Sequence, residues 1–535
     1  MSDAMLSRHF RWLTPRVARL LGLSVFIMIT GNGMLMGKLL KAYPLQWGNV
    51  GFITSVFVLF GAATALLLLC VVAGRRLYPL LAGWFLVSSA VCAYFMDRYG
   101  TVIDITMLES TLQTDVAEAG DLLDWPFLAR VVALGIAPAV WLYRRPAASM
   151  GFAAEMKSRL LTGLLLIVLM LLCIAPYTSR YATFIREHKP VRYYANPTYP
   201  TWSLVSLIRK QLELPASTEL QSIAQDARLT DARHDIERKE LIILVVGETA
   251  RADRFAVNGY HRDTNPELMR EGVSSFRKVT SCGTSTAVSV PCMFSGMEAD
   301  AFSLADAGKR ENVLDVLKRN GVEILWRDNN SDSKGVALRV PFEDFKSPQV
   351  NPVCDTECRD GGMLPGLDEW IARHKDKDLL IVLHQMGNHG PAYYKRYPQA
   401  FEFFKPVCKT SELSACTKEE LDNAYDNAIR YTDHFLGQVI RLLKRHDETH
   451  ATAMLYVSDH GESLGENGLY LHGAPKVIAP KEQTHVAAIA WTGKYFDWPV
   501  AALRTFINEP LSHSDLFCTL LAGFEVEASQ CKGKR

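Results

Sequence analysis

The sequence predicts a protein of two parts, a bundle of five membrane-spanning helices followed by a large α/β domain. Residues 1–180 are mostly apolar, whereas after about residue 205 short apolar runs alternate with helical patterns. The 535 residues carry a formal net charge of only +1, so the average composition conceals two regions suited to different solvents. Because this balance comes without a basic tract, we expect no nucleic-acid partner.

Five apolar runs are long enough to cross a bilayer, which takes about 20 helical residues. They lie near 17–37, 48–72, 78–97, 123–143 and 159–177. Basic residues gather before the first run, after the second and between the fourth and fifth, which predicts a cytoplasmic N-terminus. An odd number of crossings then exports the C-terminal domain. A cleaved signal peptide is the alternative for the first run, but no small-residue cleavage pattern follows it.

The segment after the last run is rich in aromatic residues and proline. It contains "PVRYYANPTYPTW", and such residues favour the headgroup zone of a membrane. A short amphipathic pattern follows, so we expect a bridge lying on the membrane surface, with a mobile linker as the alternative. The predicted domains are therefore 1–178, with an acidic outer loop at 97–122, then a bridge at 179–238 and an exported domain at 239–535.

The cysteines are distributed as expected for an exported domain. Of 11 cysteines, Cys70, Cys92 and Cys173 lie in apolar runs and eight lie in the C-terminal part. An even number at short spacings in an oxidising compartment predicts disulfides rather than zinc ligation by a CxxxC pair. Pairing between sequence neighbours gives Cys282–Cys292, Cys354–Cys358, Cys408–Cys416 and, with less support from the pattern, Cys518–Cys531.

Four apolar runs of the exported domain end abruptly in polar residues. These runs, "LIILVVGE", "VEILWRD", "LLIVLHQ" and "AMLYVSDHG", are typical of parallel strands covered on both faces, with helices such as 419–446 between them. Ligands of such sheets bind beyond the carboxyl ends of the strands. The residues found there are Glu248, Asp328, His384 with His389, and Asp459 with His460.

This set of side chains predicts a metal site. Zinc is bound by nitrogen and oxygen ligands in tetrahedral geometry, and Glu248, Asp459 and His460 could supply three of them while leaving a fourth position open. The alternative is that a carboxylate at such a position only caps a helix.

The loop "CGTSTAVSVP" supplies a candidate for the fourth position. An alcohol is a poor nucleophile unless a base or a metal lowers its pKa. This loop precedes a helical stretch, and a helix N-terminus directs backbone N–H groups at a bound phosphate. A disulfide between Cys282 and Cys292 would hold the turn rigid. Residue types do not choose among the hydroxyls of Thr284, Ser285, Thr286 and Ser289, and a stapled surface loop is the alternative.

Several long motifs occur together in one order. "VVGETARADRFAVNGYHRDTNPEL", "TSCGTSTAVSVPCMFS", "LHQMGNHGPAYYKRYP" and "LYVSDHGESLGENGLYLHG" resemble the phosphoethanolamine transferases that modify lipid A and confer polymyxin resistance. The resemblance covers most of 241–485 and extends to the five-span layout. It implies an alkaline phosphatase/sulfatase-like fold for the exported domain. It also implies zinc-dependent transfer of phosphoethanolamine from phosphatidylethanolamine to a lipid A phosphate through a threonine intermediate.

The resemblance also implies roles for individual residues. It makes Thr286 the nucleophile and the fourth zinc ligand beside Glu248, Asp459 and His460. It gives His389 and His472 a place around the phosphoethanolamine group and at a possible second zinc ion. The other expected contacts with substrate are Asn330, Ser331 and Lys334 of "DNNSDSKG" and Ser110, Thr114 and Glu118 of the 97–122 loop. The family commonly has Asn where this chain has Ser110. The first three disulfides also fit the family.

The resemblance further implies a multi-pass protein of the Gram-negative inner membrane, with its catalytic domain in the periplasm, and we expect a monomer. Core sugars and periplasmic glucans are the alternative acceptors. A sulfatase is a rival class, but "SVPCM" has Met293 where the sulfatase motif requires arginine. A phosphoglycerol transferase and a catalytically silent lipopolysaccharide binder are the other rivals. The cysteine framework argues against the former, and the intact metal and nucleophile residues argue against the latter.

Overall fold

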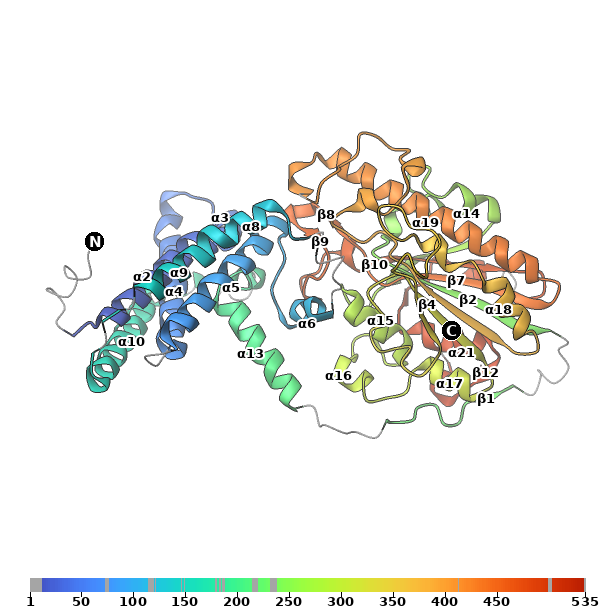
Figure 1. The fold of residues 1–535 in the computed structure, drawn as a ribbon, viewed down its shortest axis with the longest axis horizontal. Helices are drawn as coiled ribbons and strands as arrows, with labels where there is room; N and C mark the ends of the chain where they lie inside the picture. The colour runs from blue at the N-terminus through green and yellow to red at the C-terminus, as the bar shows by residue number, and fades with distance from the viewer. Residues whose placement is uncertain are drawn as a thin grey trace. The chain divides into compact units, whose positions relative to one another are not determined.

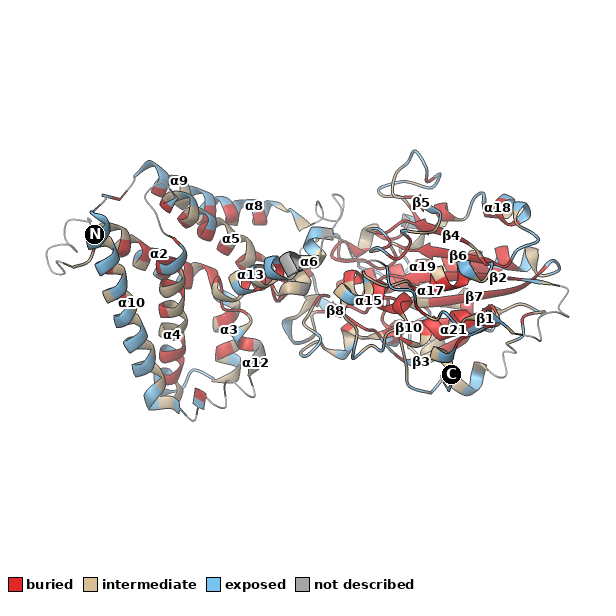
Figure 2. Cartoon of the chain, turned by 90° about the horizontal axis from the view of Figure 1, so that it is seen from below, coloured by how far each residue is buried: buried red, intermediate tan, exposed pale blue. Residues whose placement is uncertain are grey.

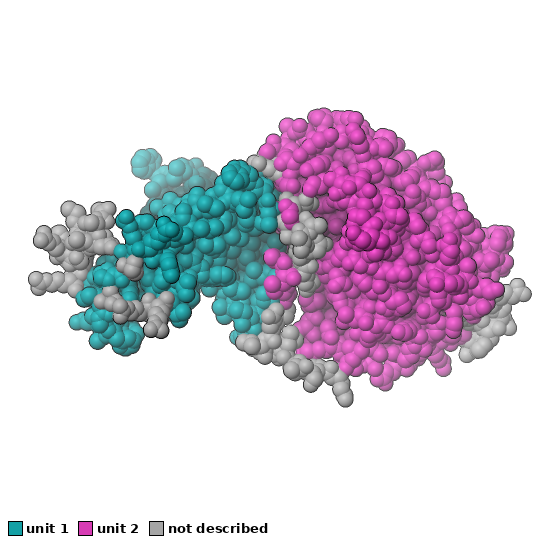
Figure 3. Space-filling model, viewed as in Figure 1, with its two compact units in different colours: residues 1–108, 123–211 teal, residues 109–122, 212–535 magenta. Residues whose placement is uncertain are grey.

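The computed structural model describes most of the chain. The described residues are 12–72, 77–113, 120, 122–145, 147–148, 150–178, 180–181, 184, 188–213, 220–230, 238–498 and 503–533. They form two compact units (Figure 3). The first unit comprises residues 1–108 and 123–211, and the second comprises residues 109–122 and 212–535.

The first unit is a bundle of apolar helices (Figure 1). Among the described residues, four helices are long and apolar enough to cross a membrane, and the count rises to five if a bent pair is taken as one span. The bent pair is α2 (Pro15–Gly31) and α3 (Gly33–Ala42). Two other spans are α4 (Trp47–Val71) and α5 (Tyr78–Tyr99). A third, Trp125–Arg144, consists of α8 (Trp125–Val131), the π-helical turn η1 (Val132–Ile136) and α9 (Ala137–Arg144). The fourth, Phe152–Tyr177, contains α10 (Phe152–Ile174). Most of α10 is exposed or intermediate, as expected of a lipid-facing helix (Figure 2).

The first apolar run is broken, whereas the sequence predicts one continuous span over 17–37. The chain bends by 64° between α2 and α3, at Asn32. The Asn32 side chain donates to the Asn196 carbonyl at 2.7 Å and accepts from the Asn196 N–H at 2.9 Å. Asp97 accepts from the Met34 N–H at 2.7 Å, next to the start of α3. Because distant polar side chains satisfy the backbone at the break, the bend can persist within an apolar bundle.

Two further helices follow the predicted features. The amphipathic stretch of the bridge is α13 (Thr198–Glu213), which the short α12 (Lys189–Arg192) precedes. The acidic loop at 97–122, which the sequence predicts to lie on the outer side, contains α6 (Ile105–Gln113), on which Ser110 lies. Thr114 and Glu118 lie outside the described residues.

The second unit is built on an eight-stranded sheet with the order β11-β3-β10-β7-β2-β6-β4-β5. Its centre is parallel, because β2 (Lys239–Gly247) pairs with both β7 (His450–Ser458) and β6 (Leu379–His384), and β6 pairs with β4 (Glu323–Asp328). An antiparallel strand, β10 (His485–Thr492), joins β7 to β3 (Ser274–Thr280). The edge strands are β5 (Phe342–Asp344) and β11 (Leu511–Ser512).

Helices cover both faces of this sheet (Figure 2). Alternate residues of β2 point to opposite faces of the sheet. Ile243 belongs to the hydrophobic core shared with α19 (Lys418–His446), on one face. Leu244 belongs to the core shared with α17 (Val313–Arg319) and α21 (Asp515–Gly523), on the other. Double coverage explains why the central strands are continuous apolar runs. The remaining helices are α14 (Pro266–Glu271), α15 (Thr286–Ser295), α16 (Leu304–Ala307) and α18 (Leu367–Arg373), and the small strands are β1 (Arg228–Leu229), β8 (Ser463–Leu464), β9 (Tyr470–Leu471) and β12 (Val526–Glu527).

Four disulfides staple the loops of this unit, and each joins cysteines that are neighbours in the sequence. They are Cys282–Cys292, Cys354–Cys358, Cys408–Cys416 and Cys518–Cys531. Cys70, Cys92 and Cys173, in the membrane helices, are free.

Candidate active site

The carboxyl ends of the two central parallel strands bring three candidate metal ligands together. Glu248 follows β2, and Asp459 and His460 follow β7, the strand beside it. One ligand atom from each of the three lies within 4.8 Å of the other two. All three side chains are fully buried. Because adjacent parallel strands end at the same edge, residues more than 200 positions apart in the sequence meet here.

Thr286 reaches the same place from a helix. It is the first residue of α15, and Ser285 is the N-cap. The Thr286 hydroxyl lies 3.1 Å from Oε2 of Glu248 and 3.4 Å from Nε2 of His460. Among the hydroxyls of the loop, the Thr284 side chain instead donates to the Ala474 carbonyl at 2.7 Å. The fold therefore selects Thr286 as the hydroxyl beside the candidate ligands.

Neighbouring groups hold the candidate ligands in place. Nδ1 of His460 lies 2.9 Å from the Gly461 carbonyl, so that nitrogen carries the proton and Nε2 faces the carboxylates. Asp459 accepts from the backbone N–H of His460 at 2.7 Å and of Thr249 at 3.1 Å. The Thr249 hydroxyl donates to Oε1 of Glu248. Such outer contacts orient metal ligands and tune their basicity.

The cluster is strongly charged for a buried site. Burial by itself would raise the pKa of Glu248, but the His460 imidazolium holds that pKa well below its usual range. Burial and the Glu248 carboxylate raise the pKa of Asp459. Burial opposes charge on His460, yet the Asp459 and Glu248 carboxylates raise its pKa to about 10. The site thus favours a positive charge at the point where the three side chains converge.

A zinc ion fits these residues. Oδ2 of Asp459 is buried and accepts no hydrogen bond from any residue that the structure describes. Nε2 of His460 lies 3.4 Å from it and 3.3 Å from Oε1 of Glu248. One imidazole nitrogen and two carboxylates form a donor set that zinc accepts, and the Thr286 hydroxyl lies 3.1 Å from Oε2 of Glu248, beside this set.

Comparisons with known proteins found similarity along most of the chain. A family model described as "Phosphoethanolamine transferase EptA/EptB" matches residues 60–212, and a model described as "Sulfatase" matches residues 240–526. The phosphatidylethanolamine transferase Mcr-1 of Escherichia coli is 46% identical over 525 residues, covering 96% of this chain and 95% of that protein. This chain belongs to the phosphoethanolamine transferase family.

Two further members support the same assignment. The phosphoethanolamine transferase EptA of Escherichia coli K12 is 38% identical over 462 residues, covering 84% of this chain and 82% of that protein. The solved structure of the integral membrane lipooligosaccharide phosphoethanolamine transferase A (EptA) from Neisseria meningitidis matches with a TM-score of 0.92 at 32% identity, covering 96% of both chains. The transferase thus has the alkaline phosphatase/sulfatase-like fold in its second unit, joined to membrane helices.

Two other histidines of the transferase lie beside the candidate metal site. The rings of His472 and His460 have centroids 4.3 Å apart, and those of His472 and His389 are 5.3 Å apart. Nδ1 of His472 lies 3.3 Å from Oε1 of Glu462, whose other oxygen accepts from the Tyr393 hydroxyl at 2.9 Å. Glu462 and Tyr393 are not among the residues predicted from the sequence. The position of Glu462 within "SDHGES", two residues after His460, was the available signal.

The segment after β4 contributes a side-chain amide that contacts Glu248. Asn330 donates to Oε2 of Glu248 at 2.8 Å and to the Gln385 carbonyl at 2.7 Å, so its amide holds a candidate ligand. Ser331 and Lys334 belong to the same segment, and Nζ of Lys334 donates to the Ser331 carbonyl at 2.8 Å. Lys334 has a φ of +52°, which turns the chain sharply at this residue.

Asp328 and His384, at the same strand edge, pair with each other. Nδ1 of His384 lies 2.8 Å from Oδ2 of Asp328, and both side chains are fully buried. Asp328 also accepts from the Asn330 N–H at 2.9 Å, so the pair supports the segment after β4 instead of joining the three clustered candidate ligands.

Proposed function

We propose that this transferase moves phosphoethanolamine from phosphatidylethanolamine to a phosphate of lipid A through a phosphoethanolamine–Thr286 intermediate. The observation that carries the proposal is the position of the Thr286 hydroxyl, 3.1 Å from Glu248 and 3.4 Å from His460 at the start of α15. A buried alcohol beside a metal-ligand cluster and a helix N-terminus suits covalent transfer of a phosphoryl group.

The proposed metal ligands are Glu248, Asp459, His460 and the oxygen of Thr286. Zinc bound there supplies a Lewis acid that lowers the pKa of the Thr286 alcohol and offsets charge on the phosphoryl oxygens. The protein's own contribution is to hold the ligands: Gly461 fixes the tautomer of His460, and Asn330 orients Glu248. A second zinc ion near His389 and His472 belongs to the same proposal.

The first step transfers the phosphoethanolamine group from the donor lipid to Thr286. Thr286 Oγ1 loses its proton and forms a bond to the donor phosphorus. The bond from that phosphorus to the diacylglycerol oxygen breaks, and the departing oxygen takes up a proton. His389 and His472 flank the site and are the proposed proton carriers, because an imidazole nitrogen can both accept and donate a proton.

The second step transfers the phosphoethanolamine group from Thr286 to the acceptor. An oxygen of a lipid A phosphate attacks the same phosphorus, the bond to Thr286 Oγ1 breaks, and the threonine oxygen regains a proton. Donor product leaves before acceptor enters, so the kinetics are ping-pong. The proposed contacts with the phosphoethanolamine group and its lipid are Asn330, Ser331, Lys334, Ser110, Thr114 and Glu118.

Both substrates are lipids, which accounts for a catalytic domain tethered to membrane helices. The proposed location is the Gram-negative inner membrane, with the N-terminus in the cytoplasm, the catalytic domain in the periplasm and the chain acting as a monomer. An added amine offsets negative charge on lipid A, so cationic polymyxins bind the surface less tightly. Resistance to polymyxin follows from the proposed reaction.

Mass spectrometry of lipid A tests the proposal. Cells that express the wild-type chain should show a phosphoethanolamine adduct on lipid A, and cells that express Thr286→Ala should not. Ser285→Ala is the matched control, since the neighbouring Ser285 side chain makes no capping hydrogen bond in the described structure and should leave the adduct in place. An adduct in the Thr286→Ala cells would refute the nucleophile. An adduct on core sugars or glucans alone would show that lipid A is not the acceptor.

The covalent intermediate has its own measurement. Purified protein incubated with phosphatidylethanolamine and no acceptor should gain the mass of one phosphoethanolamine group, and peptide mapping should locate it on Thr286. An adduct at Thr284, Ser285 or Ser289 would contradict the proposal, and so would turnover without any adduct.

A further inference from the structure

One buried histidine that the proposed reaction does not use connects the nucleophile turn to the metal-ligand strand. His513 follows the short strand β11 and is 1% exposed. Its ring nitrogen Nδ1 accepts from the backbone N–H of Cys282 at 3.2 Å. Its other nitrogen, Nε2, donates to the backbone carbonyl of Ser458 at 2.9 Å. One neutral tautomer satisfies both bonds, with the proton on Nε2.

Both residues that bond the His513 ring lie close in the chain to residues of the proposed active site. Cys282 lies four residues before Thr286 and is joined to α15 by its disulfide with Cys292. Ser458 is the last residue of β7 and immediately precedes Asp459. The Ser458 hydroxyl accepts from the Ala250 N–H at 2.7 Å, two residues after Glu248. The imidazole therefore spans the segments that carry the nucleophile and the metal ligands.

The sheet alone does not make this connection. The pairing of β10 with β7 ends at Ala488 and Val457, one residue short of Ser458. On the other side, β11 pairs with β3 up to Ser512 and Thr280, and the His513 N–H continues to the Thr280 carbonyl at 3.2 Å. Beyond these last pairs, the His513 ring supplies the hydrogen bonds that a strand would otherwise make.

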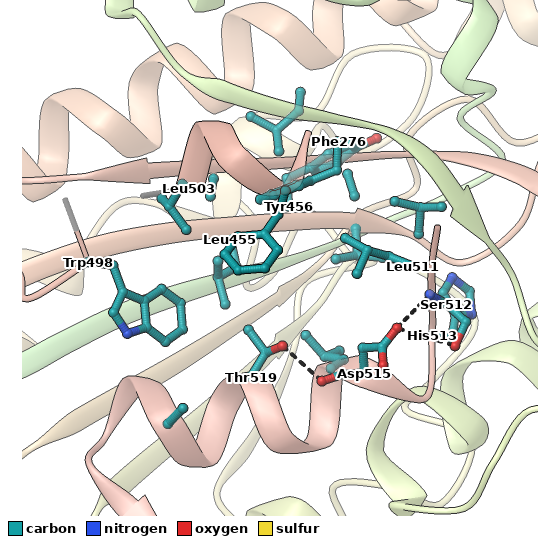
Figure 4. Close-up of a pocket in the computed structure, with 18 of the residues that line it drawn as sticks. Phe276, Leu455, Tyr456, Trp498, Leu503, Leu511, Ser512, His513, Asp515 and Thr519 are labelled. Carbon is teal, nitrogen blue, oxygen red and sulfur yellow. Dashed lines mark hydrogen bonds between the residues drawn. The ribbon is translucent and has the colours of Figure 1, made fainter. Parts of the chain in front are cut away.

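The ring also closes one end of an apolar cavity of about 410 Å³ between the sheet and α21 (Figure 4). Phe276, Leu455 and Leu503 line this cavity. An apolar neighbourhood favours the uncharged ring, and burial lowers the pKa of His513 to about 4. The imidazole thus remains neutral at neutral pH and keeps Nδ1 free to accept from Cys282.

We propose that His513 is a positioning residue that sets the nucleophile turn against the end of β7, so that the Thr286 hydroxyl is aligned for attack. This inference rests on the proposed function, because it takes Thr286 as the nucleophile. Displacement of a reacting group by a fraction of an ångström is enough to slow a reaction substantially. Among the described residues, His513 makes no hydrogen bond to a candidate metal ligand or to Thr286, so its contribution passes through the backbone of Cys282. The bond to the Ser458 carbonyl keeps the proton on Nε2, which leaves Nδ1 able to accept from Cys282.

Two conservative variants separate the two bonds. Asparagine places an amide oxygen near the position of Nδ1, so His513→Asn keeps an acceptor for the Cys282 N–H and loses the donor to Ser458. Glutamine places an amide nitrogen near the position of Nε2, so His513→Gln keeps the donor and loses the acceptor. His513→Leu removes both. Thr519→Val is the control, because Thr519 lines the same cavity and its hydroxyl donates to the Asp515 carbonyl of its own helix.

The measurement is the rate at which full-length, zinc-loaded protein in detergent acquires phosphoethanolamine on Thr286, at a series of phosphatidylethanolamine concentrations. We expect His513→Leu and His513→Gln to lower the maximal rate by roughly tenfold or more, with the half-saturating donor concentration unchanged. His513→Asn should recover most of that rate, and Thr519→Val should match the wild type. Zinc per chain, measured in the same samples, reports how much protein is folded and loaded.

The outcomes are distinct. A wild-type protein that acquires no adduct on Thr286 refutes the proposed function, not the positioning role alone. If the wild type is loaded and His513→Gln is as fast as His513→Asn, the Cys282 bond does not position the nucleophile and the inference is wrong. The inference is equally wrong if the maximal rate per zinc-loaded molecule is the same in His513→Leu and the wild type. If His513→Leu does not fold, the comparison of His513→Asn with His513→Gln still shows whether the bond to Cys282 positions the nucleophile.

Discussion

The side-chain amide of Asn330 donates to Oε2 of Glu248 at 2.8 Å, the same oxygen that accepts from the Thr286 hydroxyl at 3.1 Å. The amide also donates to the Gln385 carbonyl at 2.7 Å. It therefore ties the segment after β4 to the segment after β6 and fixes the carboxylate between them. A residue expected to contact substrate thus contacts a candidate metal ligand.

Replacing Asn330 should weaken metal binding. In Asn330→Ala, Glu248 loses the amide that orients it, and we expect zinc affinity to fall by roughly 10- to 100-fold. Competition with a chromogenic chelator measures the affinity. Asn320→Ala serves as the control, because the Asn320 side chain donates to the Val316 carbonyl of the helix that precedes it. Equal affinities in wild type and Asn330→Ala would show that Glu248 needs no such support.

Thr286→Ser should keep the intermediate and slow its formation. Serine retains the hydroxyl, but the β-branched threonine has fewer side-chain rotamers and holds its oxygen toward Glu248 more firmly. We expect a loading rate about tenfold lower, with the adduct on residue 286. Peptide mapping after incubation with donor measures both. A serine variant that is never loaded would indicate that the threonine methyl group has a role beyond restricting rotation.

Gly461→Ala should destabilise the second unit. A Cβ at this position would lie 2.1 Å from the backbone carbonyl oxygen of Glu482, which cannot move as a flexible side chain can. The Gly461 carbonyl also accepts from His460, so the displaced backbone would disturb a candidate ligand. We expect a loss of roughly 1–3 kcal/mol, seen as a lower Tm of the detergent-solubilised chain. Gly308→Ala, where a Cβ meets only ordinary contacts, should leave Tm unchanged.

The pH dependence of stability should carry a contribution from His513. Burial lowers its pKa in the folded protein to about 4, from about 6.5 in the unfolded chain. A depressed pKa contributes stability above pH 6.5, and that stability is lost as the pH falls toward 4, by about 1.4 kcal/mol per pH unit for one proton. His513→Asn cannot titrate there. In thermal melts at constant excess zinc, the wild-type advantage in Tm should therefore shrink from pH 8 to pH 5.

The zinc-dependent groups titrate equally in both proteins, so the difference between the two melts isolates His513. A wild-type advantage that is the same at every pH would contradict the buried, neutral state of this ring.

The fold class follows from features that are local in the sequence. Each membrane helix is a run of about 20 apolar residues, and each central strand is a short apolar run that stops at a polar residue. Polar residues at the ends of parallel strands must meet at one edge, which is why Glu248, Asp459 and His460 could be grouped in advance. The disulfides join cysteines only 4 to 13 positions apart, a spacing that loops of an exported domain can close.

Only the tertiary structure decided which side chains from distant segments satisfy one another. The bend at Asn32 depends on Asn196, 164 residues away, and the apolar pattern of the run conceals it. Residue types left four hydroxyls as equal candidates, and packing brought Thr286 to Glu248. The bond from His513 to Cys282 spans 231 positions. Hydropathy and spacing record what a segment prefers by itself, whereas a polar partner from elsewhere in the chain is known only after the sheet and helices have assembled.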